Sequence, residues 1–268
     1  MTLLLIGCGN LGKIILEGFV KKKKKISVLE KNIKVCKNIE KKFSRVECFS
    51  EPNKVNWDKV SYIMICVKPK DSKKIFSEIK NYCNKNHVIL SFIAGLQTKT
   101  ISKWIISKSS VIRIMPNIFI ASNNSSTAVY ANNLKSKIKR KIDKDFGEFG
   151  EIIWVNKEEK IDFFTAMFGG GPAYFFYILN CFNEIIKKNG FTENESISAI
   201  KFLLKGVLED IKKKNYKFSD SIRKVASKGG TTEEGLKVLS KSDNLFKLFE
   251  KAIMSAEKKS KIISKKLQ

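Results

Sequence analysis

The feature that most constrains the fold is a glycine-rich turn near the start of the sequence. An apolar run, Thr2 to Ile6, leads into Gly7-Cys8-Gly9-Asn10-Leu11-Gly12, and Lys13 to Val20 then carries apolar side chains at helical spacing. Three glycines spaced G-x-G-x-x-G between a strand and a helix are typical of a turn that binds a dinucleotide pyrophosphate at the helix N-terminus. A turn that is glycine-rich for structural reasons alone is the alternative.

Glu30 stands at the tip of the next expected strand, Ile26 to Leu29, which follows a run of lysines. In a dinucleotide-binding fold, an acid at this position accepts hydrogen bonds from the adenosine ribose hydroxyls and repels a 2′-phosphate, which favours NADH. Lys31 and Lys34 blur this preference, and an exposed loop glutamate is an equally good interpretation. NADPH and NADH therefore both stay open.

Strands and helices alternate along the first part of the chain. Strands are expected at 60–67, 87–92, 111–115, 126–130 and 151–155, and helices at 73–83, 98–106 and 134–149. This alternation predicts an α/β fold with a doubly wound, mostly parallel Rossmann-type sheet, which binds ligands at the carboxyl ends of its strands. From about Glu158 only helical periodicity remains. We therefore expect a dinucleotide-binding domain at 1–157 and a helical domain at 158–268.

One segment of the helical part, Ser227 to Gly235, stands out because two glycines precede a pair of threonines. The spacing of Thr231 and Glu234 predicts a capping box at a helix N-terminus. Backbone N–H groups of Gly230 to Thr232 would then be able to hold a small carboxylate. The alternative is that these residues only cap the helix.

The charge of the chain suggests a nucleic-acid partner, but its composition argues against one. The formal net charge is +26, and only four of the 52 basic residues are arginines. Arginine, rather than lysine, supplies the bidentate fork that reads phosphates and guanines. Net charge bears on solubility and steering rather than on fold. We interpret the excess lysine as compositional drift on solvated faces, with a polyanion partner as the alternative.

Cysteine and histidine exclude other chemistry. The six cysteines form no CxxC pair, and His87 is the only histidine, so a histidine-ligated metal site or a Ser-His-Asp triad is not expected. We expect no metal and a reducing, cytoplasmic location, since no targeting segment is apparent. The charge-free stretch Phe163 to Asn183 approaches the length of a membrane span, but Gly169 to Pro172 interrupt it. No membrane association is therefore expected.

Several ordered motifs resemble those of the pyrroline-5-carboxylate reductase family, over essentially the whole chain. The motifs are Ile6 to Gly12, Val67-Lys68-Pro69, Ala94-Gly95, Arg113 to Asn117, Gly171 to Tyr174 and Ser227-x-Gly229-Gly230-Thr231-Thr232. The resemblance implies hydride transfer from NADPH or NADH to 1-pyrroline-5-carboxylate, giving L-proline. It also implies a C-terminal all-helical dimerisation domain, which in some members builds larger rings.

The resemblance assigns site residues one by one. The cofactor would contact Ile6, Gly7, Cys8, Gly9, Asn10, Leu11, Gly12, Glu30, Asn53, Val67, Lys68, Pro69, Ala94, Gly95, Met115 and Asn117. The substrate would contact Ser227, Gly229, Gly230, Thr231 and Thr232, with the partner subunit completing the site. Thr232 is the expected catalytic residue, whose hydroxyl orients the ring nitrogen or relays a proton from water.

The sequence departs from the family pattern at three positions. Lys228 replaces the usual proline, and Phe168 and Gly170 replace the usual serines, which puts any further role of the Gly170 loop in doubt. Two alternatives remain open. One is a two-domain hydroxyacid dehydrogenase, and the other is a non-catalytic nucleotide sensor or nucleic-acid binder on the same scaffold.

Overall fold

The structure is a computed structural model that describes residues 2–105 and 109–267. The chain forms two compact units: residues up to Gly170 together with those from Met254 onward, and residues Gly171–Ile253. The expected domain boundary after residue 157 stays a prediction.

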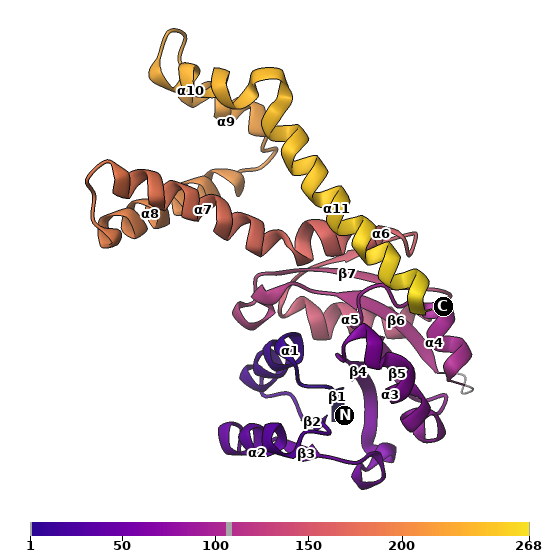
Figure 1. Ribbon diagram of the computed structural model, residues 1–268. Helices are drawn as coiled ribbons and strands as arrows, with labels where there is room; N and C mark the ends of the chain where they lie inside the picture. Colours follow the sequence, from indigo (N-terminus) through magenta and orange to yellow (C-terminus); the bar gives the residue numbers. More distant parts are fainter. Residues whose placement is uncertain (1, 106–108, 268) are drawn as a thin grey trace. The chain divides into compact units, whose positions relative to one another are not determined.

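The first unit is built on an eight-stranded sheet with the order β3-β2-β1-β4-β5-β6-β7-β8 (Figure 1). The strands are β1 (Thr2–Ile6), β2 (Ile26–Leu29), β3 (Glu47–Phe49), β4 (Val60–Ile65), β5 (Val88–Ser91), β6 (Ser110–Met115), β7 (Ser125–Ala131) and β8 (Gly150–Trp154). All neighbours pair in parallel except β6 and β7. The expected doubly wound, mostly parallel sheet is confirmed.

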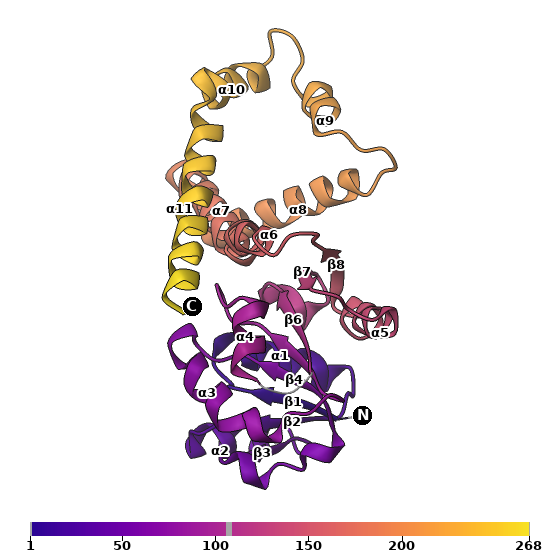
Figure 2. The ribbon, with the colours of Figure 1, turned by 90° about the vertical axis from the view of Figure 1, so that its right-hand side faces the viewer.

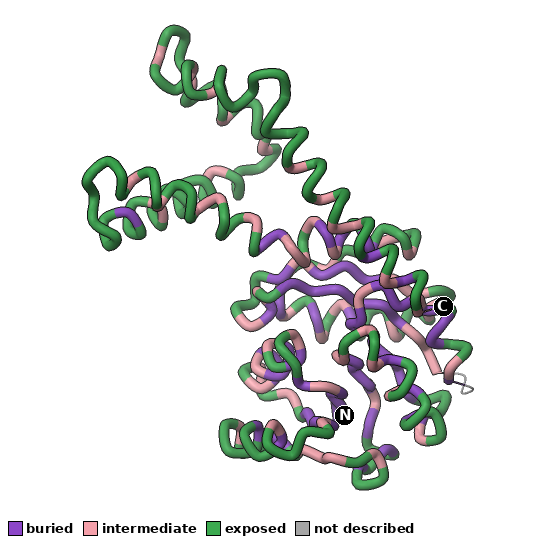
Figure 3. Tube along the Cα trace, in the orientation of Figure 1, coloured by how far each residue is buried: buried purple, intermediate pink, exposed green. Residues whose placement is uncertain are grey.

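Helices cover both faces of this sheet. They are α1 (Asn10–Lys21), α2 (Ile33–Lys42), α3 (Ser72–Ile79), α4 (Thr98–Trp104), α5 (Ser136–Gly147) and α6 (Lys160–Phe164), with the last part of α11 (Asn244–Leu267). One core joins α1, α2 and α5 to the sheet, and another joins α3 and α4 to its opposite face. Central strands such as β1 are buried along their whole length, as Figure 3 shows, which explains their continuous apolar runs.

The expected strands of this unit are confirmed to within a few residues, but two further elements were missed. These are α2 and β3, which lie between the second and third expected strands. They bring Cys36 and Cys48 together as a disulfide with a Cα–Cα distance of 5.3 Å. The absence of a CxxC pair gave no sign of this bond, because a helix and a strand, rather than a short motif, place the two cysteines in contact. The expected end of α4 at Ile106 lies outside the described residues.

The second unit is helical (Figure 2). It holds α7 (Gly171–Lys188), α8 (Glu193–Ile211), α9 (Phe218–Val225), α10 (Thr231–Ser240) and the first part of α11. Helical periodicity in the sequence predicts one long segment from Thr231 onward, but the helix is interrupted at Lys241–Asp243, where Ser242 and Asp243 have φ values of 53° and 54°. Most of this unit is exposed, as Figure 3 shows. Its exposed residues include large apolar ones such as Phe175, Tyr177 and Phe202.

The charge-free stretch Phe163 to Asn183 forms the end of α6, a π-helical turn (Thr165–Gly169) and most of α7. Among the described residues, no helix is both long and apolar enough to cross a membrane.

Candidate functional site

A cleft of about 360 Å³ opens at the carboxyl ends of β1, β2 and β4. In a doubly wound sheet this edge is where ligands bind. The cleft is lined by Ile6, Gly7, Gly9, Leu29, Glu30, Lys31, Ser50, Pro52, Cys66, Val67, Lys68, Lys70, Asp71, Lys74, Ile75 and Glu78. Six of the expected cofactor residues therefore share one cavity. Lys70 and Lys74 were not anticipated, because nothing in their local sequence distinguishes them from solvated lysines.

The three glycines of the first turn are required for different reasons. Gly7 has a φ of +86°, and a Cβ there would lie 2.7 Å from Val67 Cγ1. A Cβ on Gly12 would collide with the carbonyl oxygen of Gly7, so this glycine lets helix α1 pack against the turn. A Cβ on Gly9 would meet nothing within 4 Å. No protein atom requires a glycine at position 9. The open space beside Gly9 therefore fits a ligand that approaches the protein backbone closely.

The N-terminus of α1 points donors into this turn. Gly9 is the N-cap residue and supplies no side-chain cap, and the N–H groups of Asn10 and Leu11 make no hydrogen bond within the described part of the chain. Unpaired N–H groups at a helix N-terminus, together with the helix dipole, favour a phosphate. The residues present therefore fit a dinucleotide pyrophosphate.

Glu30 contacts the turn directly. Its Oε2 accepts a hydrogen bond from the N–H of Cys8 at 2.8 Å, and its Oε1 accepts one from the N–H of Asn32 at 3.0 Å. Burial, followed by the charge of Glu30, raises the pKa of the Cys8 thiol to about 11. Glu30 is thus a fixed carboxylate of the cleft rather than a free loop side chain.

The remaining cofactor residues near the cleft are placed unevenly. Val67 and Lys68 line it, whereas Pro69 begins a 3-10 turn (Pro69–Asp71) and accepts a hydrogen bond from the Ser72 hydroxyl at 2.7 Å. Asn53 is exposed on another 3-10 turn (Pro52–Lys54) and does not line the cleft, although its neighbour Pro52 does.

A second group of expected cofactor residues lies around β5 and β6. Ala94 and Met115 share a small apolar cluster with Ile161 and Phe164. Gly95 has a φ of +74°, and a Cβ there would lie 2.8 Å from the backbone nitrogen of Ser264 on α11. The Oδ1 of buried Asn117 accepts a hydrogen bond from the Phe119 N–H at 3.0 Å, so this side chain caps a turn.

Arg113 anchors the same region from within. Its guanidinium is fully buried and donates to Asp162 at 2.7 Å, and Glu158 lies 3.7 Å from its Nη1. Glu158 also accepts hydrogen bonds from the N–H and the hydroxyl of Thr98, at the start of α4. One buried arginine therefore connects β6, α4 and α6.

The expected substrate residues form a tight turn in the second unit. Gly229 has a φ of +74°, and a Cβ on Gly230 would lie 2.7 Å from Ser227 Oγ, so neither position accommodates a side chain without change. Thr231 and Thr232 are exposed in the first turn of α10.

Two details of this turn correct the expectation. Gly230 is the N-cap residue, so Thr231 lies inside the helix and makes no capping box with Glu234; instead Glu233 accepts a hydrogen bond from the Gly229 N–H at 2.7 Å. The Gly230 N–H donates to Ser227 O at 3.0 Å. The N–H groups of Thr231 and Thr232 have no partner among the described residues, so two donors are available rather than three.

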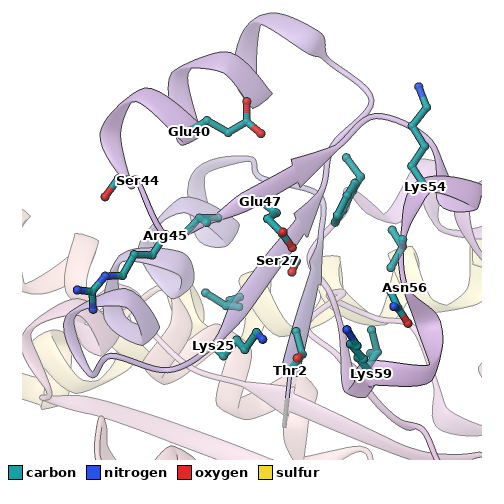
Figure 4. Close-up of a pocket in the computed structure, with 15 residues that line it drawn as sticks. Thr2, Lys25, Ser27, Glu40, Ser44, Arg45, Glu47, Lys54, Asn56 and Lys59 are labelled. Carbon is teal, nitrogen blue, oxygen red and sulfur yellow. The ribbon is translucent and has the colours of Figure 1, made fainter.

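A different cavity, of about 680 Å³, lies at the amino ends of β1, β2 and β4 (Figure 4). Lys25, Arg45, Lys54 and Lys59 surround it together with Glu40 and Glu47. The helices that follow parallel strands direct their N-terminal donors to the opposite edge of the sheet, so this cavity lacks the feature that binds a pyrophosphate. Among the described residues, no group of three or more His, Cys, Asp or Glu side chains is arranged to hold a metal ion.

Two family models match the chain. Residues 158–263 match a model described as pyrroline-5-carboxylate reductase dimerisation, and residues 2–95 match one described as NADP oxidoreductase coenzyme F420-dependent. The two matches fall on either side of the region where β6, β7 and β8 complete the sheet.

Curated and solved relatives cover nearly the whole chain. A pyrroline-5-carboxylate reductase of Staphylococcus haemolyticus is 27% identical over 99% of this chain and 98% of its own length. The solved pyrroline-5-carboxylate reductase of Coxiella burnetii is 26% identical, with a TM-score of 0.85 over 98% of both chains. A Plasmodium falciparum pyrroline carboxylate reductase, solved with NADP bound, shares the fold at 24% identity, with a TM-score of 0.87 over 98% of both chains.

Proposed function

The chain belongs to the pyrroline-5-carboxylate reductase family, and from that premise we propose that it reduces 1-pyrroline-5-carboxylate to L-proline with NADH or NADPH. The observation that carries this proposal is the full-length correspondence with the curated Staphylococcus haemolyticus reductase. A dinucleotide fold alone would leave many reactions open, since such folds host unrelated chemistry.

The reaction adds a hydride to C5 of the pyrroline ring and a proton to the ring nitrogen, so the C=N bond becomes a C–N single bond. The reduced nicotinamide supplies the hydride when it is bound. The work of the protein is to hold the two reactants in line and to keep the ring nitrogen protonated. Gly7 to Gly12 would fix the pyrophosphate, and Ala94, Gly95, Met115 and Asn117 would lie on the nicotinamide side.

Thr232 is the proposed catalytic residue. Its hydroxyl is exposed on the first turn of α10 and would orient the ring nitrogen or pass it a proton from water. The unpaired N–H groups of Thr231 and Thr232, with the Ser227 hydroxyl, would hold the substrate carboxylate. Ser227 lies beside Gly230 in the turn, which keeps that hydroxyl close to the helix N-terminus.

We propose that the enzyme is a homodimer formed through its helical part, with the partner subunit completing the substrate site. Large apolar side chains of α7, α8 and α11 are exposed, including Phe176, Leu203 and Phe246 at 56%, 60% and 66%. Exposed apolar surface of this extent is typical of a protein interface. The match to a dimerisation model over 158–263 supports the same proposal. It also supports a domain boundary after residue 157.

Three further expectations complete the proposal. A ring of dimers would appear in solution as a species several times the dimer mass. The cytoplasm, where reduced nicotinamide is supplied, is the proposed location, although the Cys36–Cys48 disulfide is of a kind more usual in oxidising compartments. Nucleic acid is not a proposed partner, because lysine rather than arginine dominates the basic surface.

A direct assay tests the function. Purified protein is mixed with 1-pyrroline-5-carboxylate and either reduced cofactor, and cofactor oxidation is followed with proline formation. Consumption of at least one cofactor with stoichiometric proline is expected. Absence of both, with steeply salt-dependent DNA binding, would instead favour a binding protein on the same scaffold.

A further inference from the structure

We propose that Glu30 makes the cofactor cleft selective for the unphosphorylated dinucleotide, NADH, over NADPH. This inference rests on the proposed function only in requiring that a nicotinamide dinucleotide occupies the cleft at the carboxyl ends of β1, β2 and β4. Glu30 would contact the adenosine ribose of the cofactor, which lies at the opposite end of the dinucleotide from the reacting nicotinamide.

The carboxylate of Glu30 is held in place rather than mobile. The N–H of Cys8 donates to its Oε2 at 2.8 Å and the N–H of Asn32 to its Oε1 at 3.0 Å. The Glu30 backbone N–H also donates to Phe49 O at 2.9 Å, which fixes the residue to the end of β3. A carboxylate offers about four lone-pair directions, so two remain free to accept ribose hydroxyls. A phosphate on the same ribose would meet an immobile negative charge.

Several backbone donors near the position of a 2′-phosphate are already occupied. Asn32 is the N-cap of α2, and its Oδ1 accepts hydrogen bonds from the N–H groups of Lys34 and Val35 at 3.0 and 3.3 Å. The Asn32 N–H is itself bonded to Glu30. At the N-terminus of α2 the side chain of Asn32 thus satisfies two N–H groups, whereas the N-terminus of α1 has no side-chain cap.

The segment from Glu30 to α2 is also held by the disulfide that joins α2 to β3. Cys36, in the first turn of α2, is bonded to Cys48 on β3, and its Sγ lies 3.4 Å from the carbonyl oxygen of Glu30. Opening this loop to admit a phosphate would require α2 to move relative to β3, which the bond opposes. Preorganisation of this kind lowers the cost of binding the ligand that fits and raises the cost of one that does not.

The lysines of the cleft are the opposing influence. Lys31, Lys68, Lys70 and Lys74 line it, against Glu30, Asp71 and Glu78. They favour dinucleotides in general, because both cofactors carry a negatively charged pyrophosphate. Lys31 is exposed and has no ion-pair partner among the described residues, so it can turn towards solvent, whereas the carboxylate of Glu30 is held by two backbone donors. The fixed group is expected to decide between the two cofactors.

The first experiment compares kcat/KM for NADH and NADPH in the intact enzyme. The wild-type enzyme is expected to favour NADH by about tenfold or more, and Glu30→Gln to lower that ratio by a similar factor, mainly through the KM for NADPH. Asp58→Asn, an exposed charge change outside the cleft, is the matched control and should leave the ratio unchanged. A wild-type preference for NADPH, or a ratio that Glu30→Gln leaves unchanged, would overturn the proposal.

The second experiment does not depend on catalysis. Binding of AMP and of adenosine 2′,5′-bisphosphate is measured by calorimetry in the wild-type enzyme and in Glu30→Gln. Tighter binding of AMP, reduced or reversed by the substitution, supports the inference even if pyrroline-5-carboxylate is not reduced, in which case only the proposed function fails. Tighter binding of the bisphosphate, lost in Lys31→Met, would assign the choice to Lys31 and contradict the inference.

Discussion

Arg113 and Ser260 donate to the same oxygen of Asp162. The guanidinium of Arg113 lies 2.7 Å from Asp162 Oδ1, and the Ser260 hydroxyl lies 2.9 Å from it. All three side chains are buried, although strand β6, helix α6 and helix α11 supply one each. A single carboxylate thus joins residues that are up to 147 positions apart, and removal of this carboxylate has a calculable consequence.

Asp162→Ala is expected to lower the free energy of unfolding by about 3 to 5 kcal/mol, because it leaves the Arg113 charge buried without its closest partner. Urea unfolding at fixed protein concentration measures the loss. Asp58→Ala, an exposed carboxylate, serves as the control. A loss no larger than that of the control would show that Glu158 alone satisfies the arginine.

The Cys36–Cys48 bond should stabilise the oxidised protein by about 3 kcal/mol, the entropy of closing a loop of roughly this length in the unfolded chain. Under oxidising conditions, replacing both cysteines by serine should lower the free energy of unfolding by this amount. Dithiothreitol should destabilise the wild type by the same amount. Thermal unfolding with and without the reductant provides the comparison. Equal stability of the oxidised and reduced wild type would contradict the prediction.

The pH dependence of thiol alkylation should reveal the charge of Glu30. Burial and Glu30 raise the pKa of Cys8 to about 11, whereas burial alone raises that of Cys83 to about 12. Burial also raises the pKa of Cys66 well above its usual value, so alkylation of the folded protein near neutral pH should be confined to exposed Cys181. Glu30→Gln should shift the alkylation profile of Cys8 to lower pH and leave that of Cys83 in place, as read by mass spectrometry.

The same raised pKa values set the sign of a stability change. Below the unfolded pKa, near 9, both thiols are protonated whether the chain is folded or not, and stability does not depend on them. Above it, the unfolded chain releases protons that the folded chain retains, so stability falls as the pH rises towards 11. Cys83→Ala should flatten this alkaline decline, and an unchanged slope would contradict the assignment.

Gly9→Ala and Gly12→Ala should separate binding from folding. The methyl group at position 9 meets no protein atom within 4 Å, so the variant should melt like the wild type and yet bind either dinucleotide at least tenfold more weakly. The methyl group at position 12 would collide with Gly7 O and should lower the melting temperature. Calorimetric titration measures binding, and thermal melting measures stability. Normal dinucleotide binding by Gly9→Ala would show that the cofactor does not bind at this turn.

Thr232→Ala should reduce kcat by about a hundredfold, as expected for loss of a group that assists proton transfer. Thr232→Ser should recover most of the activity, because it retains the hydroxyl, and the KM for the cofactor should stay unchanged in both. Thr231→Ala is the neighbouring control. Wild-type turnover in Thr232→Ala would remove Thr232 from the mechanism.

The sequence predicted the elements with strong apolar periodicity and missed those without it. Strand β1 is fully apolar and α1 follows the glycine turn, so both could be assigned directly. Helix α2 buries only Cys36 and Ile39, and β3 has only three residues, beginning with exposed Glu47. Neither element therefore shows an apolar periodicity in the sequence. The one available signal was Asn32, whose side chain caps α2.

The candidate site was predictable to the same extent. Motif spacing located the glycine turn and the Ser227–Thr232 turn, because each needs particular residue types at fixed positions. Motif spacing did not predict that Gly230 rather than Thr231 is the N-cap of α10. The start of this helix is set by the left-handed conformation of Gly229, which the sequence does not specify. Lys70 and Lys74 enter the cleft only through the path of the chain after β4.

The packing of residues 254–267 with the first unit bears on how the protein is made. Ser260 completes the Asp162 contact, and the backbone of Ser264 lies over Gly95, next to strands that were synthesised more than 150 residues earlier. A ribosome delivers the chain from its N-terminus, so the dinucleotide-binding unit lacks part of its core until translation of these residues is complete. Its final packing is therefore expected only once residues 254–267 have left the ribosome, and until then Gly95 and Asp162 lack their contacts with α11.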